Sequence, residues 1–189
     1  MISFLKRNAG KALAVLSVAI LSGLCTPASA QRVALKTNFL YWAAASPNIG
    51  LEVRVNRHMT FDFDATYNNV VVGKFDSRVL MFTPEMRYWF SGRPQAAHFV
   101  GITGLAANYN IRVKRQQHDG DAFGGGLTYG YSFVLNKNWS LEMTLGGGLI
   151  YRHEADYDVD KEDHPACSNV RKFQLAPLKA GISFIYIIK

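Results

Sequence analysis

The densest group of chemically reactive side chains lies between His153 and Cys167. This segment holds six carboxylates, two histidines and a thiol, which are groups that bind Zn²⁺ or Ca²⁺. Three of its aspartates have the spacing of the first ligands of an EF-hand loop, but Lys161 replaces the required glycine and Cys167 the required glutamate. We therefore expect a solvated, charged loop and no resident metal. The alternative is a weak metal site, with the candidate ligands His153, Asp156, Asp158, Asp160 and His164.

Charged residues also alternate with apolar ones in several other segments. Glu52 and Arg54, like Glu85 and Arg87, are two residues apart, so each pair would lie on one face of a strand. If these faces enclose an interior, the charges must pair, because an unpaired buried charge is costly. We expect an interior ion-pair network that forms a packed plug, with an ion-gating path as the alternative. Its predicted members are Lys36, Glu52, Arg54, Asp62, Asp64, Glu85, Arg87, Glu142 and Lys179.

Catalytic motifs are weak in this sequence. Ser77 and His153 could approach each other as a nucleophile and a base, but no G-x-S-x-G segment supports such a site. The glycine runs 124–126 and 146–148 lie in strand-like segments and lack the G-x-G-x-x-G spacing. We expect a protein that is not an enzyme and needs no cofactor.

Composition indicates one folded domain without a nucleic-acid surface. The chain has 189 residues, of which 49% are hydrophobic and 13% aromatic, and its formal net charge is +7. Three of these charges lie within the first eleven residues, and the remaining surplus is too dispersed for a nucleic-acid partner. A basic run at 112–115, with His118 nearby, could contact lipopolysaccharide phosphates or an acidic partner, although a solvated loop is the commoner reason for such a run.

The first thirty residues have the three parts of a secretory signal. A basic start is followed by an apolar stretch at 12–24 and by an Ala-x-Ala site that ends at Ala30. These 13 apolar residues fall below the roughly 17–25 that a membrane-spanning helix needs. A lipoprotein signal at Cys25 is the weaker alternative. We expect cleavage of residues 1–30 and one mature domain at 31–189 with a single thiol, Cys167, and therefore no internal disulfide.

After residue 31, apolar and polar residues alternate with a period of two, which is typical of a strand with two unlike faces. Phe61 and Phe63, for example, alternate with Asp62 and Asp64. No stretch approaches the length of a transmembrane helix. An eighth segment, 98–109, has strand length but alternates poorly, so its two faces stay unassigned. The seven clear strand segments are 33–41, 49–55, 59–66, 80–90, 126–135, 139–151 and 178–188.

The connections between these segments alternate between short and longer ones. The short ones at 56–58, 91–95 and 136–138 are rich in turn-forming residues, whereas a compact link at 45–48 and polar segments near 68–77, 110–122 and 152–172 form the other set. Transmembrane barrels have short periplasmic turns and longer external loops. The sequence predicts an all-β fold: an eight-stranded antiparallel up-and-down transmembrane β-barrel with a polar, side-chain-filled lumen.

A soluble barrel and a membrane barrel differ in which face points outward. Three features favour a polar interior and a lipid-facing exterior. The polar face is rich in glycine and small residues, it carries both signs of charge, and the apolar face concentrates aromatic residues near strand ends. We expect these rings at two membrane interfaces: Tyr88, Phe90, Phe133, Trp139 and Tyr186 near the short turns, and Phe39, Tyr41 and Tyr151 at the other end.

Three segments together resemble a family of small predicted outer-membrane β-barrel proteins of unknown function from Gram-negative bacteria. They read VALKTNFLYWAAASPNIGLEVRV, TPEMRYWFSG and PLKAGISFIYIIK. The resemblance spans nearly all of residues 32–189 and implies an eight-stranded barrel like OmpA or OmpX. It carries over no catalytic residue. The last strand is similar to an outer-membrane insertion signal but ends in Ile188 and Lys189 rather than in phenylalanine.

These observations predict a small integral protein of the Gram-negative outer membrane with a structural or surface-interaction role. Its expected partners are the lipid bilayer, lipopolysaccharide and a protein of the envelope or of a fimbrial assembly that contacts the external loops. We expect a monomer. An outer-membrane lipid-modifying enzyme or protease is the first alternative, and a secreted soluble barrel that carries a small ligand is the second.

Overall fold

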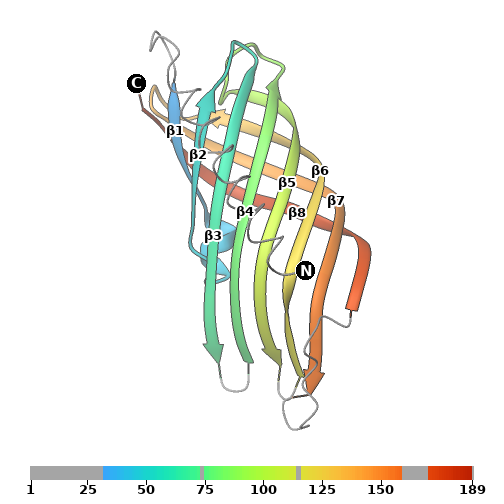
Figure 1. The fold of residues 1–189 in the computed structure, drawn as a ribbon. Helices are drawn as coiled ribbons and strands as arrows, with labels where there is room; N and C mark the ends of the chain where they lie inside the picture. Colours follow the sequence, from blue (N-terminus) through green and yellow to red (C-terminus); the bar gives the residue numbers. More distant parts are fainter. Residues whose placement is uncertain (1–31, 73–74, 114–115, 159–169, 189) are drawn as a thin grey trace, which may run out of the picture. The chain divides into compact units, whose positions relative to one another are not determined.

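The computed structural model describes residues 32–72, 75–113, 116–158 and 170–188. Eight antiparallel strands form a closed barrel in which each strand pairs with its sequence neighbours and β1 pairs with β8 (Figure 1). The predicted all-β, eight-stranded antiparallel barrel is therefore confirmed. No described helix is long and apolar enough to cross a bilayer. The strands are β1 (Val33–Asn38), β2 (Asn48–Arg54), β3 (Met59–Val72), β4 (Phe75–Trp89), β5 (Ala97–Val113), β6 (Gln116–Val134), β7 (Trp139–Asp158) and β8 (Val170–Ile188).

The predicted signal peptide at 1–30, as well as Asp160, His164 and Cys167, lies outside the described residues.

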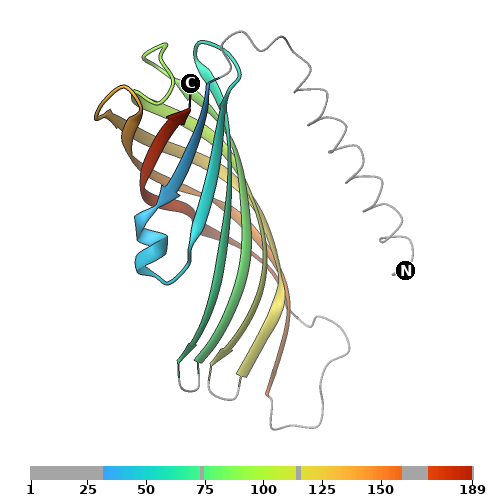
Figure 2. The same ribbon diagram turned by 90° about the vertical axis from the view of Figure 1, so that its left-hand side faces the viewer.

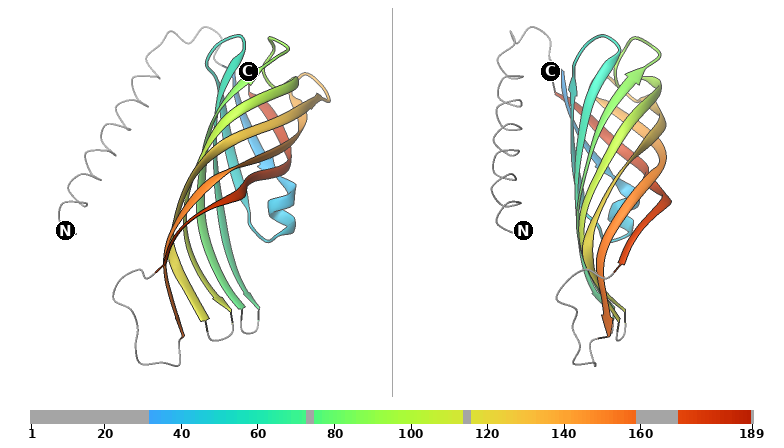
Figure 3. Two further views of the ribbon diagram at one scale, coloured as in Figure 1. Left: turned by 90° about the vertical axis from the view of Figure 1, so that its right-hand side faces the viewer. Right: turned by 45° about the vertical axis from the view of Figure 1, so that its right-hand side comes forward.

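The barrel closes over only part of its height because two strands are short. β1 has 6 residues and β2 has 7, whereas β3 to β8 have 14 to 20. Figures 2 and 3 show the long strands β3 to β7 continuing well past the ends of β1 and β2. Within the described residues, the β2 ladder reaches only Thr66 of β3, and the β1 ladder reaches only Ser183 of β8. A closed ring at the short-turn end thus continues as an open six-stranded sheet.

Two of the expected external loops are mostly strand. The β3–β4 ladder continues to the pair Val72 and Phe75, and the β5–β6 ladder continues to Val113 and Gln116. The predictions of longer polar loops near 68–77 and 110–122 were therefore wrong. Polar residues remain in a strand when its backbone groups are paired and its outer side chains meet water. In the third region, β7 extends to Asp158 and β8 begins at Val170.

The first predicted strand ends earlier than expected, at Asn38. This residue caps the short helix α2 (Phe39–Ala43), because its side-chain oxygen accepts a hydrogen bond from the Leu40 amide at 3.0 Å. Phe39 and Tyr41 therefore lie in a helix and not on the outer face of a strand. The helix fills the connection between the two short strands (Figure 2).

A β-bulge in β8 changes one predicted face. Gly146 pairs with Lys179 and the next residue, Gly147, pairs with Pro177, so Leu178 is an extra residue in the ladder. Both Leu178 and Lys179 are consequently buried on the inner side. The prediction that Leu178 lies on the outer face was wrong because strict alternation takes no account of a bulge.

The faces of β5, which the sequence left unassigned, are now defined. Phe99, Leu105 and Tyr109 are buried on the inner side, whereas Val100 and Ile102 are exposed on the outer side. Both faces are apolar over much of the strand. This composition explains why the segment alternates poorly.

Candidate functional site

Charged side chains meet inside the closed part of the barrel. β2, β3 and β4 place Glu52, Asp62 and Glu85 directly opposite one another in neighbouring strands. Each of these carboxylates is at most 1% exposed. Like charges in directly opposed positions repel, so this arrangement requires cations from other strands.

Arg87 of β4 supplies the central cation. Its guanidinium lies 2.8 Å from Asp62, 2.9 Å from Glu85, 3.1 Å from Glu142 and 3.4 Å from Glu52. The Arg87 side chain is fully buried. A planar group with several donors suits such contacts, because it can bond carboxylates on different strands at once. Arg87 therefore links β4 to β2, β3 and β7 through the interior.

Two lysines complete the network from the other side of the barrel. Lys36 of β1 lies 2.9 Å from Glu142 and 3.5 Å from Asp62. Lys179 of β8 lies 2.8 Å from Glu85 and 3.0 Å from Asp62, and it also donates to Asp64. The three cations share Asp62 as a partner. The network thus ties β1 and β8, where the barrel closes, to β3 and β4.

The network has more carboxylates than cations. In the described part of the chain, five carboxylates (Glu52, Asp62, Asp64, Glu85 and Glu142) face three cations. Among the described residues, Glu52 Oε1, Asp62 Oδ1 and Arg87 Nε are buried without a hydrogen-bond partner. Buried polar networks stabilise a fold strongly when every member is paired and weaken it when some are not. These unpaired atoms therefore mark the weakest part of the network.

The structure brings eight of the nine predicted network residues together and leaves out Arg54. The Arg54 Nε donates to the carbonyl oxygen of Asn56 at 3.0 Å, in the exposed turn after β2. The prediction that Arg54 belongs to the interior network was wrong. Arg54 is the last residue of β2, so its long side chain reaches the turn and the solvent instead of the interior.

Uncharged residues that the sequence analysis missed support the network. Thr128 donates to Glu85, and Thr144 donates to Glu142 Oε1 at 3.0 Å. The Phe99 ring lies 4.6 Å from the Arg87 guanidinium carbon, which places the cation over an aromatic face. The threonines could have been found from their alternation on the polar face. Phe99 lies in the one strand whose faces alternation did not define.

Inner glycines make room for these side chains. A Cβ at Gly101 would overlap Glu85 Oε1 and Thr128 Oγ1, and a Cβ at Gly130 would overlap the Phe99 ring. An eight-stranded barrel has an interior just wide enough for side chains to fill. The glycines on the polar face are therefore explained by close approach inside the barrel.

Apolar side chains and a turn close the interior at the short-turn end. Trp89 and Phe99 are fully buried with ring centroids 4.7 Å apart, and Trp89 Nε1 donates to Thr60 Oγ1 at 2.9 Å. The turn after β4 brings in the buried Gln95, whose carbonyl oxygen accepts from Ser132 at 2.9 Å and from Ser140 at 3.3 Å. The expected polar interior is therefore only one layer of the lumen, with an apolar layer beneath it.

Beyond the charged layer, the inner face becomes apolar. Leu105, Tyr109, Ala122 and Leu178 form a buried cluster, with Met81 among the residues that pack against it. On β5, the change falls between Thr103, beside the charged layer, and Leu105. The bulge in β8 lies at the same boundary, with Lys179 on the charged side and Leu178 on the apolar side.

On β5 and β6, the outer face changes from apolar to polar at nearly the same height. On β6, exposed Phe133, Tyr129 and Phe123 are followed by exposed Asp121. On β5, outward Ala106 pairs with Phe123, and the next outward residue, Asn108, donates to Asp121 at 3.0 Å. On β5 and β6, the outer face is therefore apolar around the charged layer and polar beyond it, where the inner face becomes apolar. On β8, by contrast, exposed Leu175 and Phe173 keep the outer face of the extended sheet apolar.

The other candidate residues form no comparable site within the described part of the chain. Ser77 is buried on the inner face of β4, and His153 lies in β7 opposite Asp121. Asp156 and Asp158 also lie in β7, and Arg112 and His118 lie in β5 and β6. Among the described residues, no group of three or more His, Cys, Asp or Glu side chains is placed to hold a metal ion.

Comparisons with known proteins give a family without an assigned activity. A search of curated proteins and a search of solved structures each found no match. A family model described as "Protein of unknown function (DUF3575)" matches residues 15–188. Because this match covers nearly the whole chain, including all eight strands, the protein belongs to the DUF3575 family.

Proposed function

We propose that this protein is an integral β-barrel of a Gram-negative outer membrane, with a structural or surface-interaction role. The observation that carries the proposal is the reversal of polarity along the strands. A wholly soluble barrel would keep apolar side chains inside and polar ones outside along its full height. An apolar exterior around a charged interior suits lipid, and the reverse arrangement above it suits water.

The height of the apolar band supports this placement. On β6, the exposed rings of Phe133 and Phe123 are ten residues apart. At a rise of about 3.4 Å per residue and a tilt of about 40°, they are separated by about 26 Å along the barrel axis. The apolar band of transmembrane barrels is about 25 Å tall. Aromatic pairs lie at both ends, Trp139 with Tyr186 and Tyr151 with Phe173.

A structural or interaction role fits the filled interior better than a pore does. The charged layer and the Trp89–Phe99 layer occupy the lumen of the closed part. The six-stranded extension would then project from the membrane and present the polar outer faces of β5 and β6, together with two strand edges, to partners in the envelope. An exposed strand edge is a common docking site for another protein. The projecting sheet thus replaces the predicted external loops as the proposed contact surface.

Two arginine substitutions test the membrane placement. Leu145 is an outward residue in the middle of the apolar band and 70% exposed, whereas Asn108 faces outward just beyond it. Leu145→Arg should lower the unfolding free energy in lipid vesicles by about 2–4 kcal/mol, the cost of a lipid-facing arginine at the bilayer centre. Asn108→Arg is the matched control and should change it by less than about 0.5 kcal/mol.

Membrane association gives an independent readout. The purified protein folded into phosphatidylcholine vesicles should stay in the membrane pellet after sodium carbonate treatment and migrate faster on a gel when unheated. A protein that folds in buffer without detergent or lipid, and in which both arginine variants behave alike, would refute the proposal and favour the secreted soluble barrel.

A further inference from the structure

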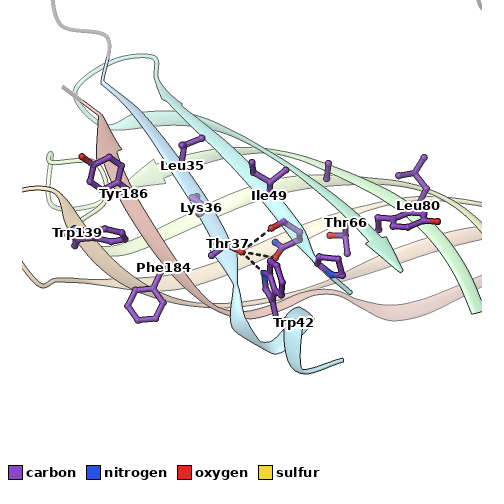
Figure 4. Close-up of a pocket in the computed structure, with 14 residues that line it drawn as sticks. Leu35, Lys36, Thr37, Trp42, Ile49, Thr66, Leu80, Trp139, Phe184 and Tyr186 are labelled. Atoms are coloured by element: carbon purple, nitrogen blue, oxygen red, sulfur yellow. Dashed lines mark hydrogen bonds between the residues drawn. The ribbon is translucent and has the colours of Figure 1, made fainter. Parts of the chain in front are cut away.

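An apolar groove crosses the outer surface of the barrel beneath α2. It runs over the outward faces of β8, β1, β2 and β3, with Trp139 and Tyr186 near one end and Leu80 at the other (Figure 4). Its volume is about 690 Å³, within the range of about 300–1,000 Å³ that is typical of small-molecule sites. The interior network plays no part in it, because the groove lies on the opposite side of the strands.

Trp42 of α2 is held in place along one side of the groove. Its indole Nε1 donates to Thr37 Oγ1 at 2.7 Å, and Thr37 Oγ1 donates to the Asn48 carbonyl oxygen at 3.0 Å. Figure 4 shows Trp42 and Thr37 joined in this way beside the groove. The indole N–H is therefore satisfied within the protein, and the 55% exposed ring offers an apolar surface to a ligand.

The chemistry of the lining indicates an uncharged, apolar ligand. Among the described residues of the lining, Lys36 is the one charged residue, and its ammonium group points into the barrel, 2.9 Å from Glu142. Ile49 and Leu35 form the floor in the middle of the groove. Within the described part of the chain, the lining thus offers no charged side chain to a phosphate or another ionic headgroup.

The dimensions of the groove favour a single chain of methylene groups. From Trp139 on β7 to Leu80 on β4, it crosses six neighbouring strands, which at about 4.8 Å per spacing is about 24 Å. An extended alkyl chain with carbon contacts of about 4 Å is narrow enough to lie along such a path, whereas a helix is about 10 Å in diameter.

We propose that this groove binds one acyl chain of a membrane lipid at a defined position on the barrel. The inference rests on the proposed membrane location, which brings acyl chains to this surface. An extended peptide is a poorer occupant, because its backbone would need hydrogen-bond partners that an apolar lining does not offer. Because the chain is already out of water in the bilayer, van der Waals packing against the fixed shape of the groove would favour this position.

Tryptophan fluorescence provides the test. The protein has three tryptophans, of which Trp42 and Trp139 line the groove and Trp89 is buried inside the barrel. The probe is 12-doxyl-stearate, a spin-labelled fatty acid that quenches nearby indoles, added to the folded full-length protein in micelles. We expect saturable quenching with one probe per protein and a residual signal from Trp89.

Two alanine-to-phenylalanine variants separate the groove from the rest of the surface. Ala65 lines the groove, and Ala106 is an outward alanine of β5 outside it. Ala65→Phe should weaken probe binding at least tenfold, and Ala106→Phe should leave it unchanged. Quenching that rises without saturation, or equally in both variants, would overturn the proposal because the chains would then contact the whole surface alike.

Two further outcomes keep the inference distinct from the proposed function. Sedimentation experiments could show that the protein is a dimer and that Ala65→Phe dissociates it. This result would overturn the acyl-chain proposal, because a second copy of the chain would then cover the groove. Saturable probe binding by a protein that fails to enter vesicles would refute the membrane location and still support the acyl-chain groove. Both variants must show the wild-type gel shift on heating, which verifies that they are folded.

Discussion

Removal of the central cation, Arg87, is the most direct test of the interior network. The guanidinium lies within 3.4 Å of four carboxylates. Three of them are on strands β2, β3 and β7, and the fourth, Glu85, is on the same strand as Arg87. Arg87→Met keeps a long side chain but removes the charge and the donors. Five carboxylates would then face only Lys36 and Lys179.

The cost follows from the burial of these groups. Arg87 and its partners Glu52, Asp62 and Glu85 are at most 1% exposed, so water cannot replace the lost bonds. Removing one partner of a buried ion pair typically costs about 3–5 kcal/mol. With a urea dependence of about 2 kcal/mol per molar, the unfolding midpoint should fall by about 1.5–2.5 M. Arg87→Lys keeps the charge but loses the planar fork and should fall between Arg87→Met and wild type.

Glu52→Gln is the matched variant with the opposite expectation. Glu52 has an unpartnered Oε1, and its Oε2 makes the long contacts of the network, 3.4 Å to Arg87 and 3.6 Å to Lys36. The substitution removes one of the two excess negative charges at constant shape. The unfolding midpoint should therefore stay within about 0.5 M of wild type or rise. Glu52→Gln in the Arg87→Met background should recover part of the lost stability.

The assay is equilibrium urea unfolding in lipid vesicles or micelles, followed by tryptophan fluorescence and by the gel shift of unheated samples. Lowering the pH should narrow the difference between Arg87→Met and wild type, because protonation neutralises carboxylates left without a partner. The reasoning is refuted if Arg87→Met unfolds within 0.5 M of wild type (about 1 kcal/mol). It is also refuted if Glu52→Gln is as harmful as Arg87→Met.

Three further predictions concern the packing of the interior. Gly101→Val should abolish the folded gel band, because its Cβ would overlap Glu85 and Thr128. The control Gly125→Val, on the open outer face, should fold. Equal folded fractions of the two variants would contradict this prediction. Trp89→Ala should lower the unfolding free energy by about 3–5 kcal/mol in the same urea assay, since it leaves a cavity in a closed layer; a loss below 1 kcal/mol would show that the layer is loosely packed. Planar bilayers containing the folded protein should conduct no better than empty ones, because charged and aromatic layers fill the lumen, and discrete channel openings would contradict this.

Much of the closed barrel could be predicted from the sequence because strand faces follow a local rule. Successive side chains of a strand point to opposite sides, so Asp62 and Glu85 were assigned to the face opposite Phe61 and Met86 without any structure. The short turns and the number of strands were equally visible, since turn-forming residues interrupt the alternation. The chain therefore specifies locally which charges share a face.

Features that break local regularity were not predictable in this way. Leu178 turned inward because a bulge in β8 inserts one extra residue into the ladder with β7. Asn38 ended β1 early because its side chain caps α2. By strand alternation Arg54 should point into the interior, but it lies at the end of its strand and donates a hydrogen bond to the turn. Each of these depends on one pairing or one hydrogen bond that a period of two does not reveal.

The sequence by itself determined the alternation of the strands, and with it the set of charges that face inward. Only the tertiary structure decided which charges meet, for example Lys36 and Glu142, which are 106 residues apart in the chain and 2.9 Å apart in space. The tertiary structure also decided where the barrel stops being closed and where its polarity reverses. The physical reason is that the face of a residue depends on its nearest neighbours in the chain, whereas its partners depend on the register of all eight strands at closure.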